Sequence, residues 1–316
     1  MGFLHFENSI LKKDLLNRYS LEGKRIRGGI IYLESAWQEA LARIEKGGEL
    51  PFLVKMILGE LTAAALLLRS QIKLDGELSL QLHGGGALRF AVVEVGVDYN
   101  FRAALGLDSS LPIQNAVPDD LVNSEGRLDV TIKNGKGADF AAPYQGIISL
   151  NEASFRSKLF LSSLVEQYMT ESEQIPTQVK LEANSLQIGG LLVQSIPDDK
   201  MSDYDTFDGL HSLDLQLNKG ALLNENPESI LKRLYPTFSV RMYDTAQPFY
   251  ACKCSKERVE QMLVLLGTAE LKALREERGN VETRCEFCNR TYFYSGEELE
   301  RLIVLSALST AKSRAH

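Results

Sequence analysis

Residues 76–95 read Gly-Glu-Leu-Ser-Leu-Gln-Leu-His-Gly-Gly-Gly-Ala-Leu-Arg-Phe-Ala-Val-Val-Glu-Val, and this stretch decides the fold class. Leu78, Leu80 and Leu82 alternate with polar residues, which is the period of a strand that buries one face. The glycine run 84–86 then turns the chain into a second apolar segment, residues 88–95. The stretch therefore predicts a hairpin of two antiparallel strands, and a turn explains the glycines better than a phosphate-binding loop does.

The same layout recurs in both directions along the chain. Further hairpins are predicted for residues 128–132 with 145–150 and for residues 178–181 with 188–196. Apolar residues at helical spacing predict helices over residues 37–44, 52–68 and 155–169. Because these helices do not alternate strictly with strands, the sequence predicts an α+β protein with a mainly antiparallel sheet core and flanking helices.

Three parts are expected along the chain. Residues 1–199 form the α+β core. Residues 200–250 have weak helical preference, with Gly209 and Gly220 inside the apolar pattern and a second short helix at 230–235, and are predicted to be a metastable helical linker. Residues 251–316 form a small C-terminal domain.

The composition is that of a folded protein. Of 316 residues, 44% are hydrophobic and 24% charged, which excludes wholesale disorder, collagen and coiled coil. The net charge of -7 provides no basic surface, so no nucleic acid is expected as a partner. The apolar stretch 61–68 is far shorter than the roughly 20 residues of a bilayer span, so no membrane is expected either. The N-terminus lacks a signal pattern, and we expect a cytoplasmic protein.

The four cysteines stand in two short pairs, Cys252-Lys253-Cys254 and Cys285-Glu286-Phe287-Cys288. Structural zinc sites use four tetrahedral ligands, and two thiolate pairs joined by an intervening helical segment satisfy that geometry. The sequence therefore predicts one Zn²⁺ per chain on Cys252, Cys254, Cys285 and Cys288, with Asn289 able to adopt a left-handed turn conformation. Two plainer alternatives remain: four ordinary buried thiols, or a zinc ion that only holds a small domain together.

The one-residue spacing of Cys252 and Cys254 points beyond a purely structural zinc, because it leaves these thiols close enough to join each other. A zinc-bound cysteine is a thiolate, the form that oxidants convert to sulfenic acid and a neighbouring thiol converts to a disulfide. Oxidising either pair removes two ligands, so the metal should leave and the C-terminal domain should unfold. We expect the apolar residues of the linker to rest on this domain and to be released with it. The expected apolar core of the domain is Val259, Met262, Leu263, Leu266, Leu271, Leu274, Tyr292, Tyr294, Leu299, Leu302 and Ile303.

The sequence around these cysteines resembles the 33 kDa chaperonin family, also called heat shock protein 33. The resemblance lies in Cys252–Arg258 and Cys285–Tyr292, and it extends upstream over nearly the whole chain. The upstream segments, in the family's order, are Leu58–Leu61, Lys73–Leu82, Tyr144–Gly146, Ser172–Thr177, Gly189–Gln194 and Leu231–Tyr235.

The resemblance implies an ATP-independent holdase, not an enzyme, that is inactive when reduced and zinc-loaded. It implies that oxidative stress forms the Cys252–Cys254 and Cys285–Cys288 disulfides, expels zinc and unfolds the C-terminal domain and the linker. It further implies homodimers that bind unfolded or partly unfolded client proteins and prevent their aggregation during heat or oxidative stress.

Two other functions remain open on the residues alone. The first is a zinc-ribbon adaptor or nucleic-acid-binding module fused to an α+β domain. The tail holds 11 Lys and Arg against 10 Asp and Glu, which argues against phosphate binding. The second is a thiol-disulfide oxidoreductase, but a catalytic CxxC usually opens a helix after a strand, whereas this pair has metal-ligand spacing.

Overall fold

The computed structural model describes residues 14–72, 76–108, 110–111, 113, 117–134, 143–150, 160–196 and 216–313. Contacts divide the chain into two compact units, Met1–Ala251 and Cys252–His316. The described part of the predicted linker, residues 216–250, belongs to the first unit. Residues 200–215 lie outside the described residues, so the division into core, linker and C-terminal domain stays a prediction.

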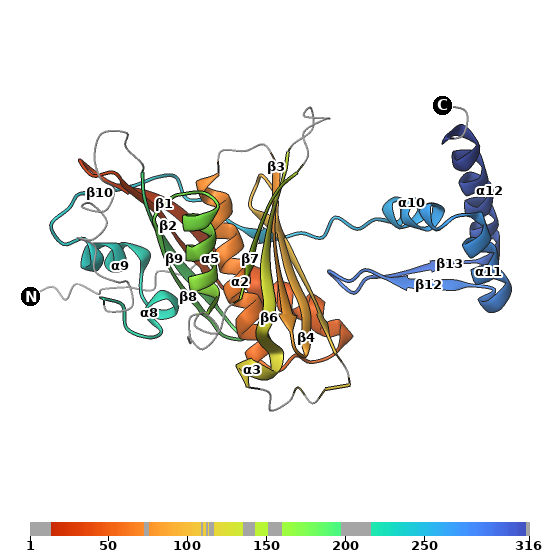
Figure 1. Ribbon diagram of the computed structural model, residues 1–316, viewed down its shortest axis with the longest axis horizontal. Coiled ribbons are helices and arrows are strands. Elements are labelled where there is room, and N and C mark those ends of the chain that lie inside the picture. The colour runs from red at the N-terminus through yellow and green to blue at the C-terminus, as the bar shows by residue number, and fades with distance from the viewer. Residues whose placement is uncertain are drawn as a thin grey trace, which may run out of the picture. The chain divides into compact units, whose positions relative to one another are not determined.

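Two sheets form the framework of the first unit (Figure 1). The five-stranded sheet has the order β10-β1-β2-β9-β8, with strands β10 (Val240–Met242), β1 (Leu15–Leu21), β2 (Ile26–Leu33), β9 (Ile188–Ser195) and β8 (Thr177–Ala183). The six-stranded sheet has the order β11-β5-β4-β3-β6-β7, with strands β11 (Phe249–Tyr250), β5 (Asn100–Leu107), β4 (Leu88–Val95), β3 (Gly76–Gly85), β6 (Val122–Asn134) and β7 (Tyr144–Ser149). Every described pairing is antiparallel except that of β11 with β5, so the predicted α+β class is confirmed.

The three predicted hairpins are confirmed as β3/β4, β6/β7 and β8/β9, for example with Leu78 opposite Val95. The sequence reasoning missed β1, β2 and β5. Gly28 and Gly29 of β2 weaken strand propensity, so the sequence pattern does not show this strand. A Cβ at Gly28 would stand 2.5 Å from the Tyr19 ring, so glycine is needed there for close packing within the strand pair.

The predicted helices 37–44 and 52–68 are confirmed as α1 (Ser35–Ile44) and α2 (Phe52–Gln71). The helix predicted at 155–169 is observed as α5 (Phe160–Glu171), and residues 155–159 lie outside the described residues. Among the described residues before the linker, two short helical elements, η1 (Glu45–Gly47) and α3 (Pro118–Leu121), are also present. Helix α2 contacts strands of both sheets and is buried along most of its length, which makes it the centre of the first unit's core (Figure 1).

The linker packs on the face of the five-stranded sheet opposite α2. A Cβ at Gly190 would meet Leu67 of α2, whereas one at the adjacent Gly189 would meet Leu222, and successive residues of a strand face opposite sides. The linker elements are α8 (Ala221–Asn224) and α9 (Pro227–Leu234). Gly220 adopts a left-handed φ of 85° and precedes α8, so the predicted helix 210–223 does not run across it; residues 210–215 lie outside the described residues.

The expected contact of the linker with the C-terminal domain stays a prediction. Apolar residues of the described linker segment are buried within the first unit. They share one cluster with residues of β1, β2 and β9, because this sheet is apolar on both faces. The cluster consists of Tyr19, Leu21, Ile26, Ile30, Leu191, Val193, Leu217, Ala221, Leu222, Ile230, Leu231, Leu234 and Tyr235.

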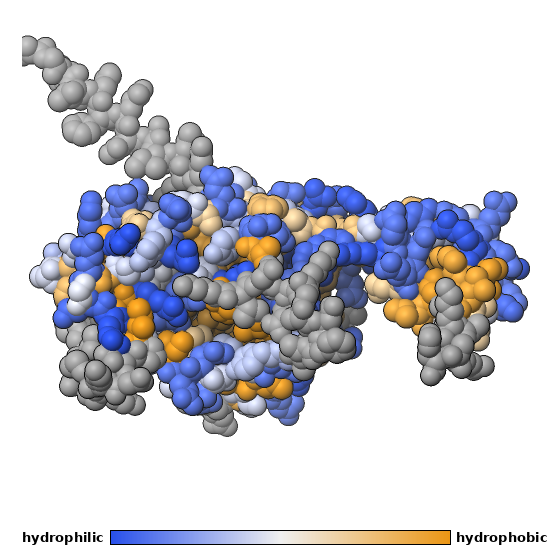
Figure 2. All heavy atoms as spheres, turned by 90° about the horizontal axis from the view of Figure 1, so that it is seen from above, coloured by the Kyte–Doolittle hydropathy of each residue, from blue (hydrophilic) through white to orange (hydrophobic). Residues whose placement is uncertain are grey.

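The C-terminal unit contains α10 (Lys256–Leu266), α11 (Thr268–Arg278), β12 (Val281–Arg284), β13 (Thr291–Tyr294) and α12 (Gly296–Ser313). Its core holds Leu263, Leu271, Val281, Tyr292, Tyr294, Leu299, Leu302 and Ile303. Met262 and Leu266, which the sequence reasoning placed in this core, are 68% and 52% exposed. Figure 2 shows apolar side chains gathered on the surface of this unit. No described helix is long and apolar enough to cross a membrane.

Gly59 provides a test of the packing of α2. Alanine in the middle of a helix normally stabilises by about 1 kcal/mol over glycine. A Cβ here would approach Ala183 to 2.7 Å and Ile188 to 2.8 Å, and overpacking of that kind costs roughly 1–3 kcal/mol. We therefore expect Gly59→Ala to lower the free energy of unfolding by about 1–2 kcal/mol in urea denaturation. A gain in stability would contradict this packing of α2 on β8 and β9.

Candidate metal centre

The four cysteines come from two segments of the C-terminal unit. Cys252 and Cys254 lie between the last strand of the first unit and α10, where Ser255 caps the helix by accepting a hydrogen bond from the Arg258 N–H. Cys285 and Cys288 lie in the turn that joins β12 to β13. The chain thus presents one pair at a helix start and the other at a hairpin tip.

The hairpin turn is closed by backbone hydrogen bonds around the second pair. The Asn289 N–H donates to the Cys285 carbonyl at 2.8 Å, and the Cys285 N–H donates to the Arg290 carbonyl at 3.0 Å. Asn289 has φ of 54°, the left-handed conformation that the sequence predicted for it. Asparagine tolerates this conformation better than most residues, because its short polar side chain can satisfy local hydrogen bonds.

All four sulfur atoms lie within 4.8 Å of one another. Two separations between the segments are close to that of metal-bound sulfurs: Cys252 Sγ to Cys285 Sγ is 3.7 Å, and Cys254 Sγ to Cys288 Sγ is 3.4 Å. Four sulfurs bound tetrahedrally to one zinc ion at about 2.3 Å would be about 3.8 Å apart. The described residues contain no other group of His, Cys, Asp or Glu with a metal-binding arrangement, and this one fits a tetrahedral ion.

All four cysteines are free thiols in this arrangement, and Cys288 is buried while the others are half-buried. The two close contacts run between the pairs, whereas the disulfides implied by the family resemblance lie within them. Since every sulfur is within 4.8 Å of every other, separation alone rules out neither pairing. The implied Cys252–Cys254 and Cys285–Cys288 disulfides therefore stay a prediction.

The thiols are not equivalent in their ionisation. Burial raises the pKa of Cys285 and raises that of Cys288 further. Burial also opposes ionisation of Cys254, but the Tyr292 hydroxyl and the three neighbouring thiols outweigh it and lower the pKa of Cys254 to about 7. Burial thus opposes ionisation of Cys285 and Cys288, and a bound divalent cation would favour the thiolate form of all four sulfurs.

Two residues of the hairpin supply polar groups beside the sulfurs. The Tyr292 hydroxyl is buried and lies close enough to Cys254 to lower the pKa of that thiol, so it can donate to a metal-bound thiolate. The pKa of Arg290 is raised by Tyr292 and then by the charges of Cys254 and Cys288, which places its guanidinium close to the cluster. A positive charge here would offset part of the excess negative charge of four thiolates around a divalent ion.

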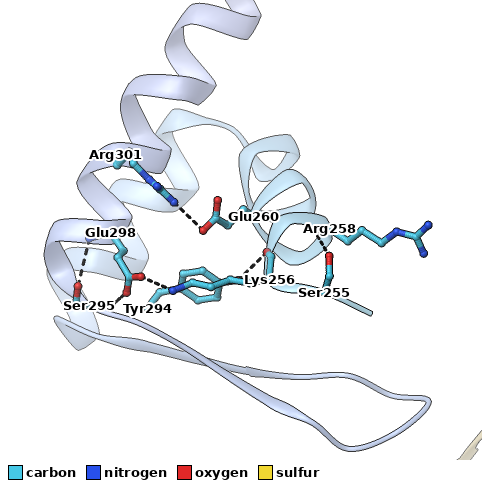
Figure 3. A network of polar contacts seen from close by, with 8 residues as sticks. All are labelled: Ser255, Lys256, Arg258, Glu260, Tyr294, Ser295, Glu298 and Arg301. Carbon is cyan, nitrogen blue, oxygen red and sulfur yellow. Dashed lines mark hydrogen bonds and ion pairs between the residues drawn. The ribbon is translucent and has the colours of Figure 1, made fainter. Parts of the chain in front are cut away.

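Polar contacts hold α10 against α12 and so fix the start of α10 beside the hairpin (Figure 3). Lys256 pairs with Glu298, and Glu260 pairs with Arg301 at 2.7 Å. The Tyr294 hydroxyl donates to the Lys256 carbonyl at 3.3 Å. The predicted capping box at Ser295 and Glu298 is present, since each backbone N–H donates to the other side chain. The pairs between α10 and α12 join residues far apart in sequence, and no local pattern predicted them.

The comparisons with known proteins cover nearly the whole chain. The family model described as Hsp33 protein matches residues 14–295. A 33 kDa chaperonin of Chromobacterium violaceum is 32% identical over 306 residues, which are 96% of this chain and 98% of that protein. A 33 kDa chaperonin of Shewanella sediminis is 31% identical over 293 residues, which are 92% of this chain and 96% of that protein.

A solved structure shares the fold. The crystal structure of the 33 kDa chaperonin (heat shock protein 33 homolog) of Thermotoga maritima matches with a TM-score of 0.74 over 93% of this chain and 99% of that chain, at 22% sequence identity.

Asn289 provides a test of how the turn positions the second pair. Asn289→Gly removes any cost of the left-handed conformation, whereas Asn289→Val adds about 1–2 kcal/mol of strain at that residue. We expect Asn289→Gly to bind zinc as tightly as the unchanged chain and Asn289→Val to bind about tenfold more weakly. Competition with a chromogenic chelator under reducing conditions measures both affinities. Equal affinities for the two variants would contradict a role of this turn in holding Cys285 and Cys288.

Proposed function

Since this chain belongs to the Hsp33 protein family, we propose that it is an ATP-independent holdase chaperone that oxidation switches on. Membership of the family makes it a chaperone, and binding of client proteins follows from that. The redox control is our proposal, and the cluster of four thiols within 4.8 Å is the observation that carries it.

In the reduced state, Cys252, Cys254, Cys285 and Cys288 would hold one Zn²⁺ per chain. A bound zinc ion supplies the positive charge that keeps all four sulfurs ionised and joins the two segments that carry them. Tyr292 would donate a hydrogen bond to the Cys254 thiolate, and the turn at Asn289 would keep Cys285 and Cys288 facing the first pair. The ordered C-terminal unit is the inactive form.

Oxidation would remove the ligands in pairs. A thiolate attacks one oxygen of hydrogen peroxide and becomes a sulfenic acid, and the O–O bond breaks to release hydroxide, which takes up a proton to give water. The neighbouring thiolate then attacks that sulfur, forms the disulfide and displaces a second hydroxide, which leaves as water. Formation of each disulfide thus transfers two electrons from two thiolates to one molecule of hydrogen peroxide. Formation of Cys252–Cys254 and Cys285–Cys288 would leave no thiolate for zinc.

Loss of zinc should unfold the C-terminal unit because its own core is small. Eight buried residues form this core, and Leu271, Leu299 and Leu302 are its fully buried members. A unit of this size rarely remains folded on apolar burial alone. Unfolding would expose these side chains, and exposed apolar surface binds the apolar surface of unfolding proteins.

We further propose the setting in which this switch acts. The active form would be a homodimer in the cytoplasm that holds unfolded or partly unfolded clients during heat and oxidative stress. It would act by binding rather than by catalysing a reaction, and it would need neither nucleic acid nor a membrane.

One assay tests the switch directly. The reduced, zinc-loaded chain is treated with hydrogen peroxide at mild heat while a chromogenic chelator reports zinc release and light scattering reports aggregation of a heated client. We expect zinc release and suppression of aggregation to rise together, and added thiol to be needed to reverse both. Zinc release with unchecked aggregation would end the holdase proposal, and an adaptor would show no gain in client binding.

Replacing a ligand tests the role of the metal. Cys288 is the most buried of the four thiols, and Cys288→Ser leaves three sulfurs. We expect at least tenfold weaker zinc retention, together with faster limited proteolysis within residues 252–313 in the reduced chain. Thr283→Ser on the adjacent strand serves as the matched control and should change neither property. A Cys288→Ser chain that retains zinc like the control would remove Cys288 from the ligand set.

A further inference from the structure

The linker is held to the first unit by charged side chains as well as by apolar packing. Strand β8 is the edge of the five-stranded sheet, and Lys180 and Glu182 lie two residues apart on it, so they project from the same face. Lys180 is only 7% exposed, which is unusual for a lysine. This face is the one that α8 covers.

Both side chains hydrogen-bond to the backbone of the linker. The Lys180 ammonium donates to the Leu217 carbonyl at 2.9 Å. The two oxygens of the Glu182 carboxylate accept hydrogen bonds from the Gly220 N–H at 2.7 Å and from the Leu222 N–H at 3.0 Å. Three backbone groups between residues 217 and 222 are therefore held by two charges.

The neighbouring strand is shaped to admit the same segment. Gly189 of β9 lies directly opposite Glu182 in the register. A Cβ at Gly189 would stand 2.7 Å from the Leu222 carbonyl oxygen, closer than such atoms approach. The missing side chain at 189 thus lets the linker backbone come within reach of Glu182.

Charged side chains at this position suit a contact that must break when the linker is released. A buried charge is costly unless hydrogen bonds satisfy it, and the linker backbone satisfies both Lys180 and Glu182. When the segment leaves, the ammonium and the carboxylate regain water, whereas the apolar packing of Leu217 and Leu222 is lost. Hydrogen bonds to charged groups are also among the stronger ones, so their loss should weaken the attachment of residues 217–222.

We infer that Lys180, Glu182 and Gly189 form a seat that positions residues 217–222, and that this seat sets how readily the linker is released. The regulatory half of this inference rests on the proposed function, because linker release is taken to activate the chaperone. The seat itself does not depend on it. Because the contacts are made to backbone N–H and carbonyl groups, the seat fixes the position of the segment rather than its side-chain identity.

Hydrogen–deuterium exchange on the full, reduced, zinc-loaded chain tests the seat. In a Lys180→Met, Glu182→Gln double variant, we expect amides of residues 221–234 to exchange about tenfold faster or more, with those of β3 and β4 unchanged. Gly189→Ala should give the same local pattern with both charges intact. Unchanged exchange in residues 221–234, or equal acceleration in β3 and β4, would overturn the inference.

Glu60→Gln is the matched control. Glu60 lies on α2, and burial, together with the charge of Glu182, raises the pKa of Glu60 to about 8. Near neutral pH its carboxyl is therefore largely protonated, and an amide is a close substitute for it. We expect this variant to exchange like the unchanged chain, and accelerated exchange here would assign the effect to the general polarity of the region and overturn the seat.

A second readout separates this inference from the proposed function. The reduced double variant should delay aggregation of a heated client without peroxide, whereas the reduced unchanged chain should not. If residues 221–234 open but the reduced variant gives no protection while the oxidised unchanged chain does, the regulatory role of the seat is overturned. If even the oxidised unchanged chain gives no protection, the proposed function fails, and exchange alone decides on the seat.

Discussion

Four thiols packed within 4.8 Å of one another form the constraint on which the rest of the C-terminal unit depends. Burial opposes the ionisation of Cys285 and Cys288, and Cys254 ionises near neutrality only with the help of its neighbours. A bound divalent cation would favour the thiolate form of all four sulfurs. The cluster also places each thiol within reach of a partner for oxidation. The proposed metal binding and redox chemistry would therefore use the same sulfurs and exclude each other, because a disulfide sulfur is a poor ligand.

The described part of the linker is attached within the first unit. It is buried on the five-stranded sheet, where α8 and α9 join the core of the first unit. Further along the chain, the Tyr235 and Tyr19 hydroxyls are 3.2 Å apart, and the Ala251 N–H donates to the Phe101 carbonyl. The next residue is Cys252, the first of the proposed ligands. Under the proposed function, release of the linker must therefore overcome attachments within the first unit itself.

The sequence predicted the parts of this protein that local pattern determines. Alternating leucines predicted β3, helical spacing predicted α1 and α2, and the cysteine pairs predicted the sulfur cluster with Asn289 in a left-handed turn. The sequence-based predictions failed where contacts between residues distant in the sequence determine the structure. Strand β2 was missed because Gly28 weakens strand propensity, and the Tyr19 ring that requires this glycine lies on another strand. Met262 and Leu266 were placed in the core but are exposed, since a short helix with apolar residues on several sides does not show which side is covered.

The polar attachments escaped prediction for a related reason. Lys180 and Glu182 look like ordinary surface charges of an alternating strand, and nothing near them in sequence indicates that the linker backbone, some 40 residues later, satisfies both. The ion pair between Glu260 of α10 and Arg301 of α12 is likewise not predicted by any local sequence pattern. The apolar pattern of the sequence therefore predicts which helices and strands form, whereas only the structure shows the polar contacts that attach them to one another.

The central claim is that a cation held by Cys252, Cys254, Cys285 and Cys288 keeps the C-terminal unit ordered. The most direct measurement is the amide exchange of residues 252–313 in the reduced chain before and after a chelator removes the metal, without any oxidant. The account predicts that protection at core positions such as Leu271, Leu299 and Ile303 is lost on metal removal and restored by added zinc, while β3 and β4 remain protected. Protection that survives complete removal of the metal would contradict it.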